Sequence, residues 1–253
     1  MLRWLRAALA AGLAAALPAA VGAADLRVLS AGALKPLVLA VAPAFERETG
    51  HRLLVDGDTA GKLMRRVQGG EAFDVVIVTA GGIEQLAREG RVLAGSAAPL
   101  ARIGIGVAVR QGAPASGIGH VAGFKAALQQ ARAVAYIDPA AGGSSGIYLA
   151  QLFERLGVAA EVQRKAVLVN GGLVANKLLS SEADLALQQM SELLVVPGIT
   201  VLGPLPEELQ NYTTYTAAVS SSPGDAAAAR ALLARLVAPA ARSWPAGHGM
   251  QAP

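Results

Sequence analysis

The chain has 253 residues, no cysteine, 4% aromatic residues and a formal net charge of +4. The lack of cysteine excludes disulfides, thiol catalysis and thiolate metal sites, and the few aromatics, without any run of Lys or Arg, argue against nucleic-acid binding. If Arg3 and Arg6 are removed with an N-terminal segment, 22 − 2 = 20 basic residues remain against 18 acidic ones. This mild basic excess suits a small anionic ligand.

The N-terminus has the features of a secretory signal peptide. Arg3 and Arg6 make the start basic, residues 7–17 are an apolar run, and small residues up to Ala24 suit cleavage. The apolar run is too short to span a bilayer. We therefore expect residues 1–24 to be a signal peptide and the mature protein to be soluble in the periplasm.

Strands and helices are expected to alternate in the first half of the mature chain. Apolar runs predict strands, and apolar residues at helical spacing predict helices. The predicted order is a strand at 26–29, a helix at 36–49, a strand at 53–55, a helix at 62–68, a strand at 73–78, a short helix after Gly82 and a strand at 103–110. Pro99 is assigned to a loop.

The same alternation continues in the second half. The predicted order is a helix at 124–131, a strand at 133–137, a helix starting near Ser144, a strand at 165–169, a helix at 173–179, a strand at 184–187, a strand at 212–220 and a helix at 225–237. Three prolines break the region 197–206, and the tail from Ser243 is expected to be loose. Such alternation predicts an α/β protein with a mainly parallel sheet.

The two halves repeat one order of elements. Ala44-Phe45-Glu46-Arg47 in the first half corresponds to Leu152-Phe153-Glu154-Arg155 in the second. Glu71-Ala72-Phe73-Asp74 corresponds in the same way to Ser181-Glu182-Ala183-Asp184. We infer two lobes of similar build. The alternative is chance, since any α/β chain shows some internal similarity of this kind.

Loops rich in small residues and neutral donors follow the predicted strands. They are Ser30 to Ala33, Asp58 to Gly61, Thr79 to Gly81, Gly142 to Gly146, Asn170 to Gly172 and Gln188 to Ser191. Ligands of parallel sheets bind beyond the carboxyl ends of the strands, on such loops. Two lobes facing each other would bury a small ligand among several helix N-termini, and neutral donors can hold an anion there.

The loop from Gly142 to Gly146 permits two interpretations. It can offer backbone N–H groups to an anion at a helix N-terminus, and it also matches the Gly-x-Ser-x-Gly pattern of serine hydrolases. The hydrolase interpretation is weak, because four residues separate Ile137 from Gly142 and because the only downstream histidine, His248, lies in the tail. His51, His120 and His248 show no metal-ligand spacing, so we expect neither a metal nor a cofactor.

Four segments carry a family resemblance that covers essentially the whole mature chain. They are Ser30-Ala31-Gly32-Ala33-Leu34, Thr59-Ala60-Gly61-Lys62-Leu63, Glu71-Ala72-Phe73-Asp74-Val75-Val76-Ile77 and Ser181-Glu182-Ala183-Asp184. With them the chain resembles periplasmic solute-binding proteins of the molybdate-binding type, which feed ABC importers. The resemblance implies two lobes, joined by crossing hinge strands, that close on a tetrahedral oxyanion such as molybdate. It also implies a transient membrane ABC permease partner, and we expect a monomer.

Lobe boundaries and ligand contacts follow from the same resemblance. Lobe one is expected at 25–104 and 206–253, and lobe two at 105–205. The family's contacts fall on Ser30, Ala31, Gly32, Ala33, Thr59, Ala60, Ser144, Ser145, Gly171 and Gln189.

The chain departs from the family at several of these contacts. Thr59-Ala60 stands where serines are expected, Asp58 before it would repel an oxyanion, and Gln188-Gln189 replaces a tyrosine segment. These departures favour a different anion, such as a small di- or tricarboxylate, with Lys35, Lys62 or Arg65 supplying a charge.

An enzyme is the alternative to a binding protein. Aconitate isomerase is similar in fold, and such an isomerase needs a base that moves a proton next to a carboxylate. Asp58 is the one candidate base that the sequence offers. Simpler roles remain open for each group: Asp58 as a solvated turn residue, and Thr59, Ser144 and Ser145 as helix caps. Tyr212 and Tyr215 are assigned to core or hinge packing, with lining of the cleft as the alternative.

Overall fold

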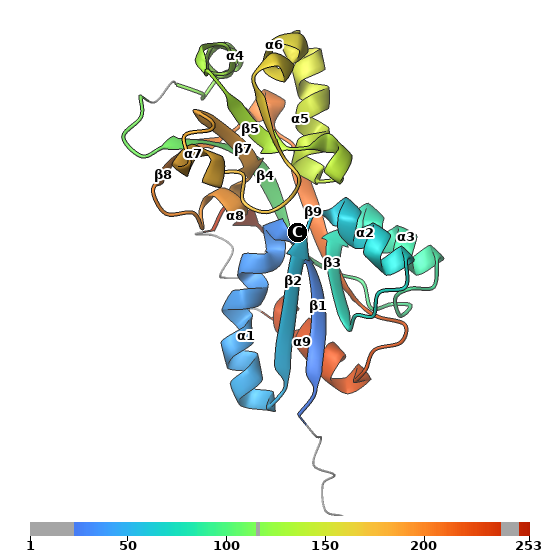
Figure 1. The fold of residues 1–253 in the computed structure, drawn as a ribbon. Helices are drawn as coiled ribbons and strands as arrows, with labels where there is room; N and C mark the ends of the chain where they lie inside the picture. The colour runs from blue at the N-terminus through green and yellow to red at the C-terminus, as the bar shows by residue number, and fades with distance from the viewer. Residues whose placement is uncertain (1–22, 115–116, 239–247) are drawn as a thin grey trace, which may run out of the picture.

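The computed structural model describes residues 23–114, 117–238 and 248–253. Nearly all of the predicted signal peptide, residues 1–22, lies outside the described residues. Within the described ranges, no helix combines the length and the apolar character needed to cross a membrane. The chain forms two α/β lobes that lie end to end (Figure 1).

The first lobe is built mainly from the N-terminal part of the chain. Its elements are β1 (Asp25–Ala31), a 3-10 turn (Gly32–Leu34), α1 (Lys35–Thr49), β2 (Arg52–Asp58), α2 (Ala60–Gln68), β3 (Val75–Thr79) and α3 (Ala80–Arg88). Pro36 lies in the first turn of α1, where its missing N–H has no cost, and Gly50 ends the helix with a φ of 77°. Thr59 caps α2 by accepting a hydrogen bond from the backbone of Lys62.

The second lobe follows the same plan. Its elements are α4 (Val121–Gln130), β5 (Val134–Ile137), a 3-10 turn (Pro139–Ala141), α5 (Ser144–Arg155), α6 (Ala159–Arg164), β6 (Ala166–Val169), α7 (Asn176–Leu179), β7 (Leu185–Gln189), α8 (Met190–Leu193) and β8 (Ile199–Pro204). A further 3-10 turn (Glu207–Leu209) leads to β9 (Tyr212–Val219), α9 (Ala226–Val237) and β10 (Met250–Gln251).

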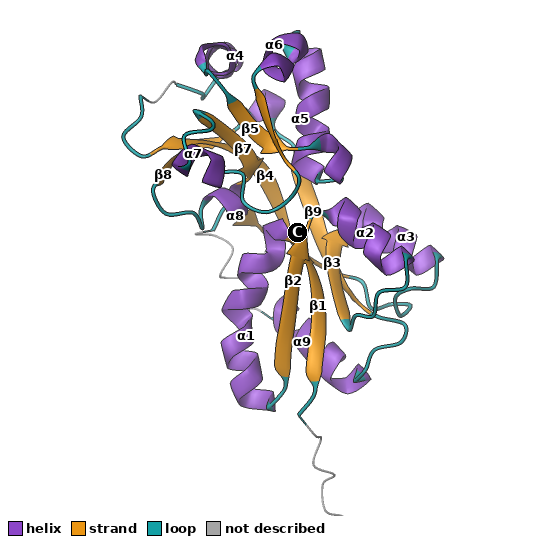
Figure 2. Ribbon diagram, viewed as in Figure 1, coloured by secondary structure: helices purple, strands orange, loops and turns teal. Residues whose placement is uncertain are grey.

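One mixed sheet, with the order β2-β1-β3-β9-β4-β7-β5-β6, runs through both lobes (Figure 2). In each lobe a central strand pairs in parallel with two neighbours: β1 with β2 and β3, and β5 with β6 and β7. The antiparallel pairs among the described strands all involve β4 or β9. The predicted α/β class is therefore confirmed, with parallel units in the lobes and antiparallel crossing strands between them.

The long strand β4 (Ala98–Arg110) passes from one lobe to the other. It pairs with β9 as far as Gly104 and with β7 from Ile105 onward. This change of partner falls where we expect the chain to pass from lobe one to lobe two. The assignment of the remaining residues to lobes stays a prediction.

Four local predictions were wrong. Pro99 lies inside β4 and not in a loop; the register of β4 shifts between Pro99 and Ala101, where a missing N–H is tolerated. The proline-containing region at 197–206 holds β8, which pairs with β4. Residues 243–247 of the tail that we expected to be loose lie outside the described residues, but at its described end β10 pairs with β4 and Met250 is buried in the core. The predicted loop after β7 continues into the short helix α8.

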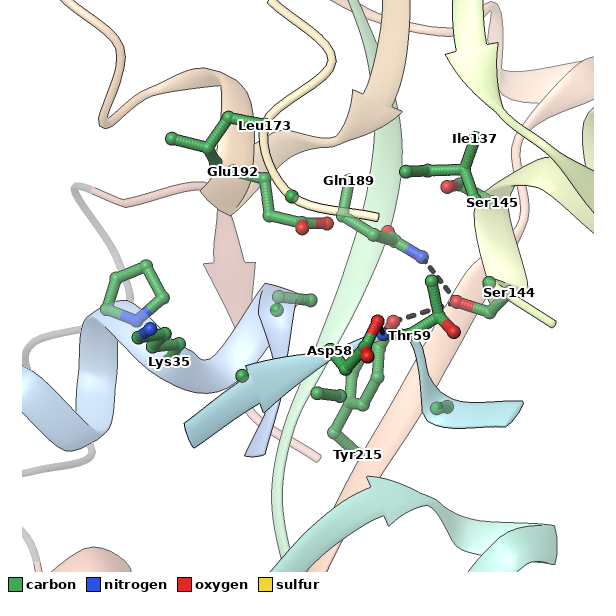
Figure 3. Close-up of a pocket in the computed structure, with 18 of the residues that line it drawn as sticks. Lys35, Asp58, Thr59, Ile137, Ser144, Ser145, Leu173, Gln189, Glu192 and Tyr215 are labelled. Carbon is green, nitrogen blue, oxygen red and sulfur yellow. Dashed lines mark hydrogen bonds between the residues drawn. The ribbon is translucent and has the colours of Figure 1, made fainter. Parts of the chain in front are cut away.

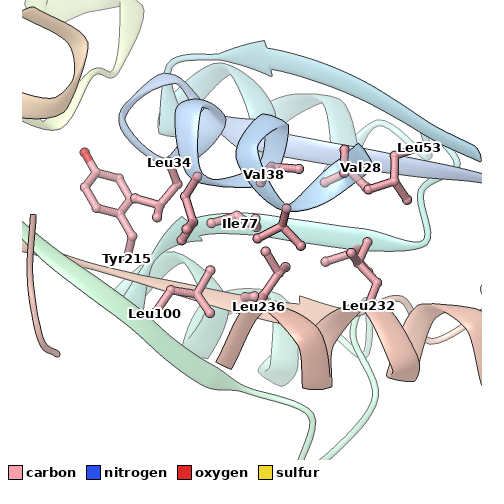
Figure 4. Packing of buried hydrophobic residues seen from close by; sticks show 14 of the residues in the cluster. Val28, Leu34, Val38, Leu53, Ile77, Leu100, Tyr215, Leu232 and Leu236 are labelled. Carbon is pink, nitrogen blue, oxygen red and sulfur yellow. The ribbon is translucent and has the colours of Figure 1, made fainter. Parts of the chain in front are cut away.

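Buried apolar residues fill both faces of the sheet in each lobe. Figure 4 shows α1 and α9 packed on one face of lobe one around Val38, Ile77 and Leu232, while α2 and α3 cover the other face. In lobe two, α4, α5 and α6 cover one face, and α7 and α8 cover the other. The faces of the sheet are thus occupied, and the carboxyl ends of the parallel strands are left to form a site.

Candidate functional site

A cavity of about 350 Å³ lies between the lobes, where loops at the carboxyl ends of β1, β2, β5 and β7 meet (Figure 3). Most of the predicted contact residues line it: Ala31, Gly32, Ala33, Thr59, Ala60, Ser144, Ser145 and Gln189. Five of the six loops predicted to form the site therefore meet here, whereas the loop from Thr79 to Gly81 does not line the cavity. That these residues bind a ligand stays a prediction.

Ser30 and Gly171 are not among the lining residues. Ser30 is fully buried, and its hydroxyl donates to the carbonyl of Ala31 at 3.0 Å. Gly171 stands at a φ of 142°, beside the side chains of Asp58 and Lys62, and Gly172 takes the place in the cavity wall.

Direct contacts between the lobes close one side of the cavity. The Thr59 hydroxyl donates to the carbonyl of Ala141 at 2.5 Å, and the N–H of Gly61 donates to the carbonyl of Gly142 at 2.9 Å. Thr59 thus has a cross-lobe bond in addition to its helix-capping role. The backbones approach so closely that a Cβ on Gly61 would lie 2.7 Å from the Cα of Gly142.

Asp58 is held in an ion pair at the cavity wall. Its Oδ1 accepts from the N–H of Thr59 at 2.8 Å and lies 3.5 Å from Nζ of Lys62. Lys62 in turn donates to the carbonyl of Asn170 in the other lobe. Both partners of this carboxylate oxygen therefore come from the start of α2.

Ser144 is the first residue of α5 and does not cap it, since Gly143 is the N-cap and no side chain binds the free N–H groups. The capping role considered for Ser144 and Ser145 is therefore wrong for both. Its Oγ lies 2.8 Å from the hydroxyl of Tyr215 and 3.1 Å from the amide of Gln189 (Figure 3). Burial raises the pKa of Tyr215, and the charge of Glu192 adds to the rise, so this hydroxyl keeps its proton.

The amide of Gln189 has one orientation that satisfies all its polar atoms. With its nitrogen toward the carbonyls of Ile103 and Gly104, at 3.0 and 3.1 Å, its oxygen accepts from Ser144 at 3.1 Å. We assign that orientation. The Ser144 hydroxyl then donates to Gln189 and accepts from Tyr215, so both lobes and the crossing strands β4 and β9 share one hydrogen-bond chain.

Glu192 is the charged lining residue that sequence reasoning missed. It lies on α8, is 8% exposed, and its Oε1 accepts from Nε2 of Gln188 at 2.8 Å. Desolvation raises its pKa to about 8, against a smaller opposite effect of the Gln188 bond. Its place after the Gln188-Gln189 strand end was the only available signal, since a single Glu in a short polar stretch has no distinctive pattern.

Gly32 makes room for Glu192. A Cβ on this glycine would lie 2.4 Å from Oε1 of Glu192. The hydroxyl of Ser191 donates to the carbonyl of Ala33 at 2.8 Å and fastens α8 to the first loop of the other lobe. The carboxyl group of Glu192 is therefore held where the two lobes meet.

Lys35 supplies the positive charge among the described lining residues. It is half-buried, forms no ion pair with any residue in the described part of the chain, and its stem passes over Gly57, where a Cβ would lie 2.7 Å from Cδ. The other two predicted charges, Lys62 and Arg65, do not line the cavity. Apolar side chains complete the wall: Pro36, Leu39, Ile137, Leu173 and Val195.

The Gly-x-Ser-x-Gly segment serves close packing. A Cβ on Gly146 would lie 2.2 Å from the carbonyl oxygen of Ile137, so only glycine lets α5 start against β5. No histidine is among the described residues that line the cavity. Nor do the described residues contain a cluster of three His, Cys, Asp or Glu side chains placed to hold a metal ion.

Comparisons with known proteins agree with this architecture. Residues 26–251 match the family model of bacterial extracellular solute-binding proteins. An aconitate isomerase from Pseudomonas sp is 37% identical over 214 residues, which cover 82% of this chain and 80% of that protein.

Solved structures share the fold at low sequence identity. The periplasmic molybdate-binding protein of Azotobacter vinelandii has a TM-score of 0.75 and 20% identity, over 90% of this chain and 99% of that one. A sulfate-binding protein of Mycobacterium tuberculosis has a TM-score of 0.68 and 16% identity, over 90% and 87%. The family match over residues 26–251, together with the two-lobed fold, shows that the chain belongs to the bacterial extracellular solute-binding protein family.

Proposed function

We propose that this protein is exported to the periplasm and closes its two lobes on a small organic acid with two or three carboxylates. The observation that carries the proposal is the composition of the cavity wall. One unpaired cation, Lys35, and the uncapped N-terminus of α5 can bind carboxylates, while Leu39, Leu173 and Val195 can cover a carbon skeleton.

The size of the cavity favours an organic acid over a tetrahedral oxyanion. Its volume of about 350 Å³ lies within the range of roughly 300–1,000 Å³ that is usual for pockets binding small organic molecules. A compact oxyanion would leave the apolar part of the wall without a partner. The ligand therefore differs from that of the molybdate-binding and sulfate-binding proteins that share the fold.

Membership of the solute-binding family supports delivery to a membrane permease of the ABC type. In this role the closed, loaded form is recognised by the permease, which opens the lobes and takes the ligand. This transport role requires only that the protein binds its ligand, without changing it chemically.

A thermal-shift series with molybdate, tungstate, sulfate, citrate, cis-aconitate and trans-aconitate tests the proposal. A ligand that binds only the folded state stabilises it by about 2.7 kcal/mol at a concentration of 100 Kd. We expect the melting temperature to rise with one or more of the organic acids and to stay unchanged with the inorganic anions. A response to the inorganic anions alone, or no response to any organic acid of the series, would contradict it.

Isomerisation of an unsaturated polycarboxylate is the second candidate. The 37% identity to an aconitate isomerase favours it, and so does Glu192, a carboxyl group at the cavity with a pKa of about 8. A group that titrates near the working pH is suited to accept and return a proton. Glu192 is the better candidate for this than Asp58, which is engaged by Lys62.

Turnover separates the two candidates. Purified protein is mixed with cis-aconitate or with trans-aconitate, and the absorbance is followed until it is constant. Isomerisation brings both mixtures to one final spectrum. If one acid binds per chain and the two mixtures keep different, constant spectra, the protein binds the acid without isomerising it.

A further inference from the structure

Glu192 is an acidic residue in the wall of a cavity that otherwise suits an anion. It is 8% exposed and is held in place by its bond with Gln188, whose own oxygen accepts from the N–H of Val174 at 2.7 Å. Gln188 also donates to the carbonyl of Gly172 at 2.8 Å. The partner of Glu192 is thus fixed on three sides, and Glu192 has little freedom to turn away.

No cation in the described part of the chain pairs with Glu192. None of the ion pairs of the described residues includes it, and within the same residues its hydrogen bond from Gln188 leaves Oε2 without a protein donor. A buried carboxylate with a single neutral donor is costly, and the group avoids that cost by keeping its proton. Since Oε1 accepts from Gln188, we assign the proton to Oε2.

We propose that Glu192 enters the ligand complex as a neutral carboxylic acid and donates a hydrogen bond from Oε2 to a carboxylate of the bound organic acid. This inference rests on the proposed function, because it names how the same cavity recognises its ligand. An acid–carboxylate hydrogen bond is charge-assisted and therefore short and strong. It turns an apparent repulsion into an attraction, and it makes capture of the ligand depend on a bound proton.

The other ionisable groups around the cavity allow Glu192 to act alone as the switch. Tyr215, on β9, keeps its proton because burial raises its pKa. Asp58, on β2, is tied to Lys62 and to the N–H of Thr59. Lys35, at the start of α1, is the cation among the described lining residues and forms no ion pair with the described part of the chain.

The dissociation constant of trans-aconitate, measured by calorimetry between pH 6 and pH 10, tests the inference. The pKa of about 8 predicts a constant value below it and a rise toward tenfold for each pH unit above it. Glu192→Gln keeps a neutral donor in the same place, so we expect it to bind the acid at every pH without that rise. Glu84→Gln, the same change on an exposed residue of α3, should follow the unchanged protein.

Three results would overturn the inference. They are a dissociation constant that does not change above pH 8, a Glu192→Gln variant that keeps the slope, and a folded Glu192→Gln variant that binds no acid even at pH 6. Circular dichroism of each variant establishes that it is folded.

A direct titration distinguishes failure of this inference from failure of the proposed function. The carboxyl carbon of Glu192 is followed by carbon-13 NMR in the full mature chain without ligand, with the Glu192→Gln spectrum as the assignment. If Glu192 titrates near the ordinary pKa of a glutamate, the inference is overturned even when the protein binds organic acids. Glu192 could instead keep its proton at neutral pH while the protein binds no organic acid at any pH. That result overturns the proposed function and, with it, the contact between Glu192 and the ligand.

Discussion

The two lobes use one plan of three parallel strands and differ in what they bring to the cavity. The order β2-β1-β3 in the first lobe matches β6-β5-β7 in the second. The helix after the central strand begins with Lys35 in one lobe and with Ser144 in the other. After the third strand, Thr79 and Gly82 in lobe one correspond to Gln189 and Glu192 in lobe two.

This comparison shows how one repeated fold produces an asymmetric site. Lobe one contributes the charged groups Lys35 and Asp58, whereas lobe two contributes neutral hydrogen-bonding groups and a buried acid. The third loop of lobe one does not reach the cavity; Thr79 and Gly82 line a separate hollow with Gln85 and Asn211. The internal repeat therefore predicts which loops can form a site, while single side chains decide what the site does.

The pH dependence of stability tests the buried acid of lobe two, and it carries the largest expected effect. The pKa of Glu192 is raised from 4.5 when unfolded to about 8 when folded. Between these values the folded protein holds a proton that the unfolded chain does not, so its stability falls as pH rises, by up to about 1.4 kcal/mol per unit. Glu192→Gln removes this loss.

We accordingly expect Glu192→Gln to gain stability over the unchanged protein from pH 5 to pH 8, with a constant difference at higher pH. Urea unfolding at pH 5, 6.5, 8 and 9 measures it. Glu84→Gln, at the surface of lobe one, is the matched control and should show no such divergence. Equal pH profiles for both variants would mean that Glu192 is ionised in the folded protein.

Gly61→Ala tests the close approach of the two lobes. Its Cβ would meet backbone atoms of Gly142, which cannot turn aside, so the lobes must separate. Overpacking of this kind costs about 1–3 kcal/mol, and we expect the affinity for the organic acid to fall on the order of a hundredfold. Gly81→Ala in α3 has open space around it and is the control, with unchanged affinity. Calorimetric titration of both variants measures the difference.

Lys35→Gln tests the charge that lobe one supplies. Hydrogen bonds to charged groups contribute about 1.5–3 kcal/mol, so we expect roughly a thirtyfold loss of affinity for trans-aconitate. Lys125→Gln on α4 makes the same change of net charge away from the cavity and should bind normally. Equal losses in the two variants would indicate attraction by overall charge instead of a contact of Lys35.

Much of the fold follows from the sequence because its signals are local. Apolar runs such as 75–78 become buried strands, and Thr59 and Asp225 cap the helices that follow them. The loops of the cavity were predicted because parallel strands end at one edge. Glu192 was not, because the four residues of α8 are too few to show a helical period.

The pairing of Ser144 with Tyr215 could not be predicted from the sequence either, because the two residues are 71 positions apart in the chain. Only the crossing strand β9 brings them together. Tyr215 packs its ring in the core of lobe one and presents its hydroxyl to lobe two. Its assignment to core or hinge packing was therefore right for the ring and incomplete for the hydroxyl.

Tyr215→Phe and Ser144→Ala test this last link between the lobes, with the smallest expected effect. A neutral hydrogen bond contributes about 1 kcal/mol, so each change should weaken binding of the acid roughly fivefold. If the two hydroxyls act through one another, the double variant loses little more affinity than either single variant. The double-mutant cycle then gives a coupling energy close to the effect of one single change. Additive losses would instead mean that Ser144 and Tyr215 contact the ligand separately. That result would make the crossing strand a third wall of the site, beside the two lobes.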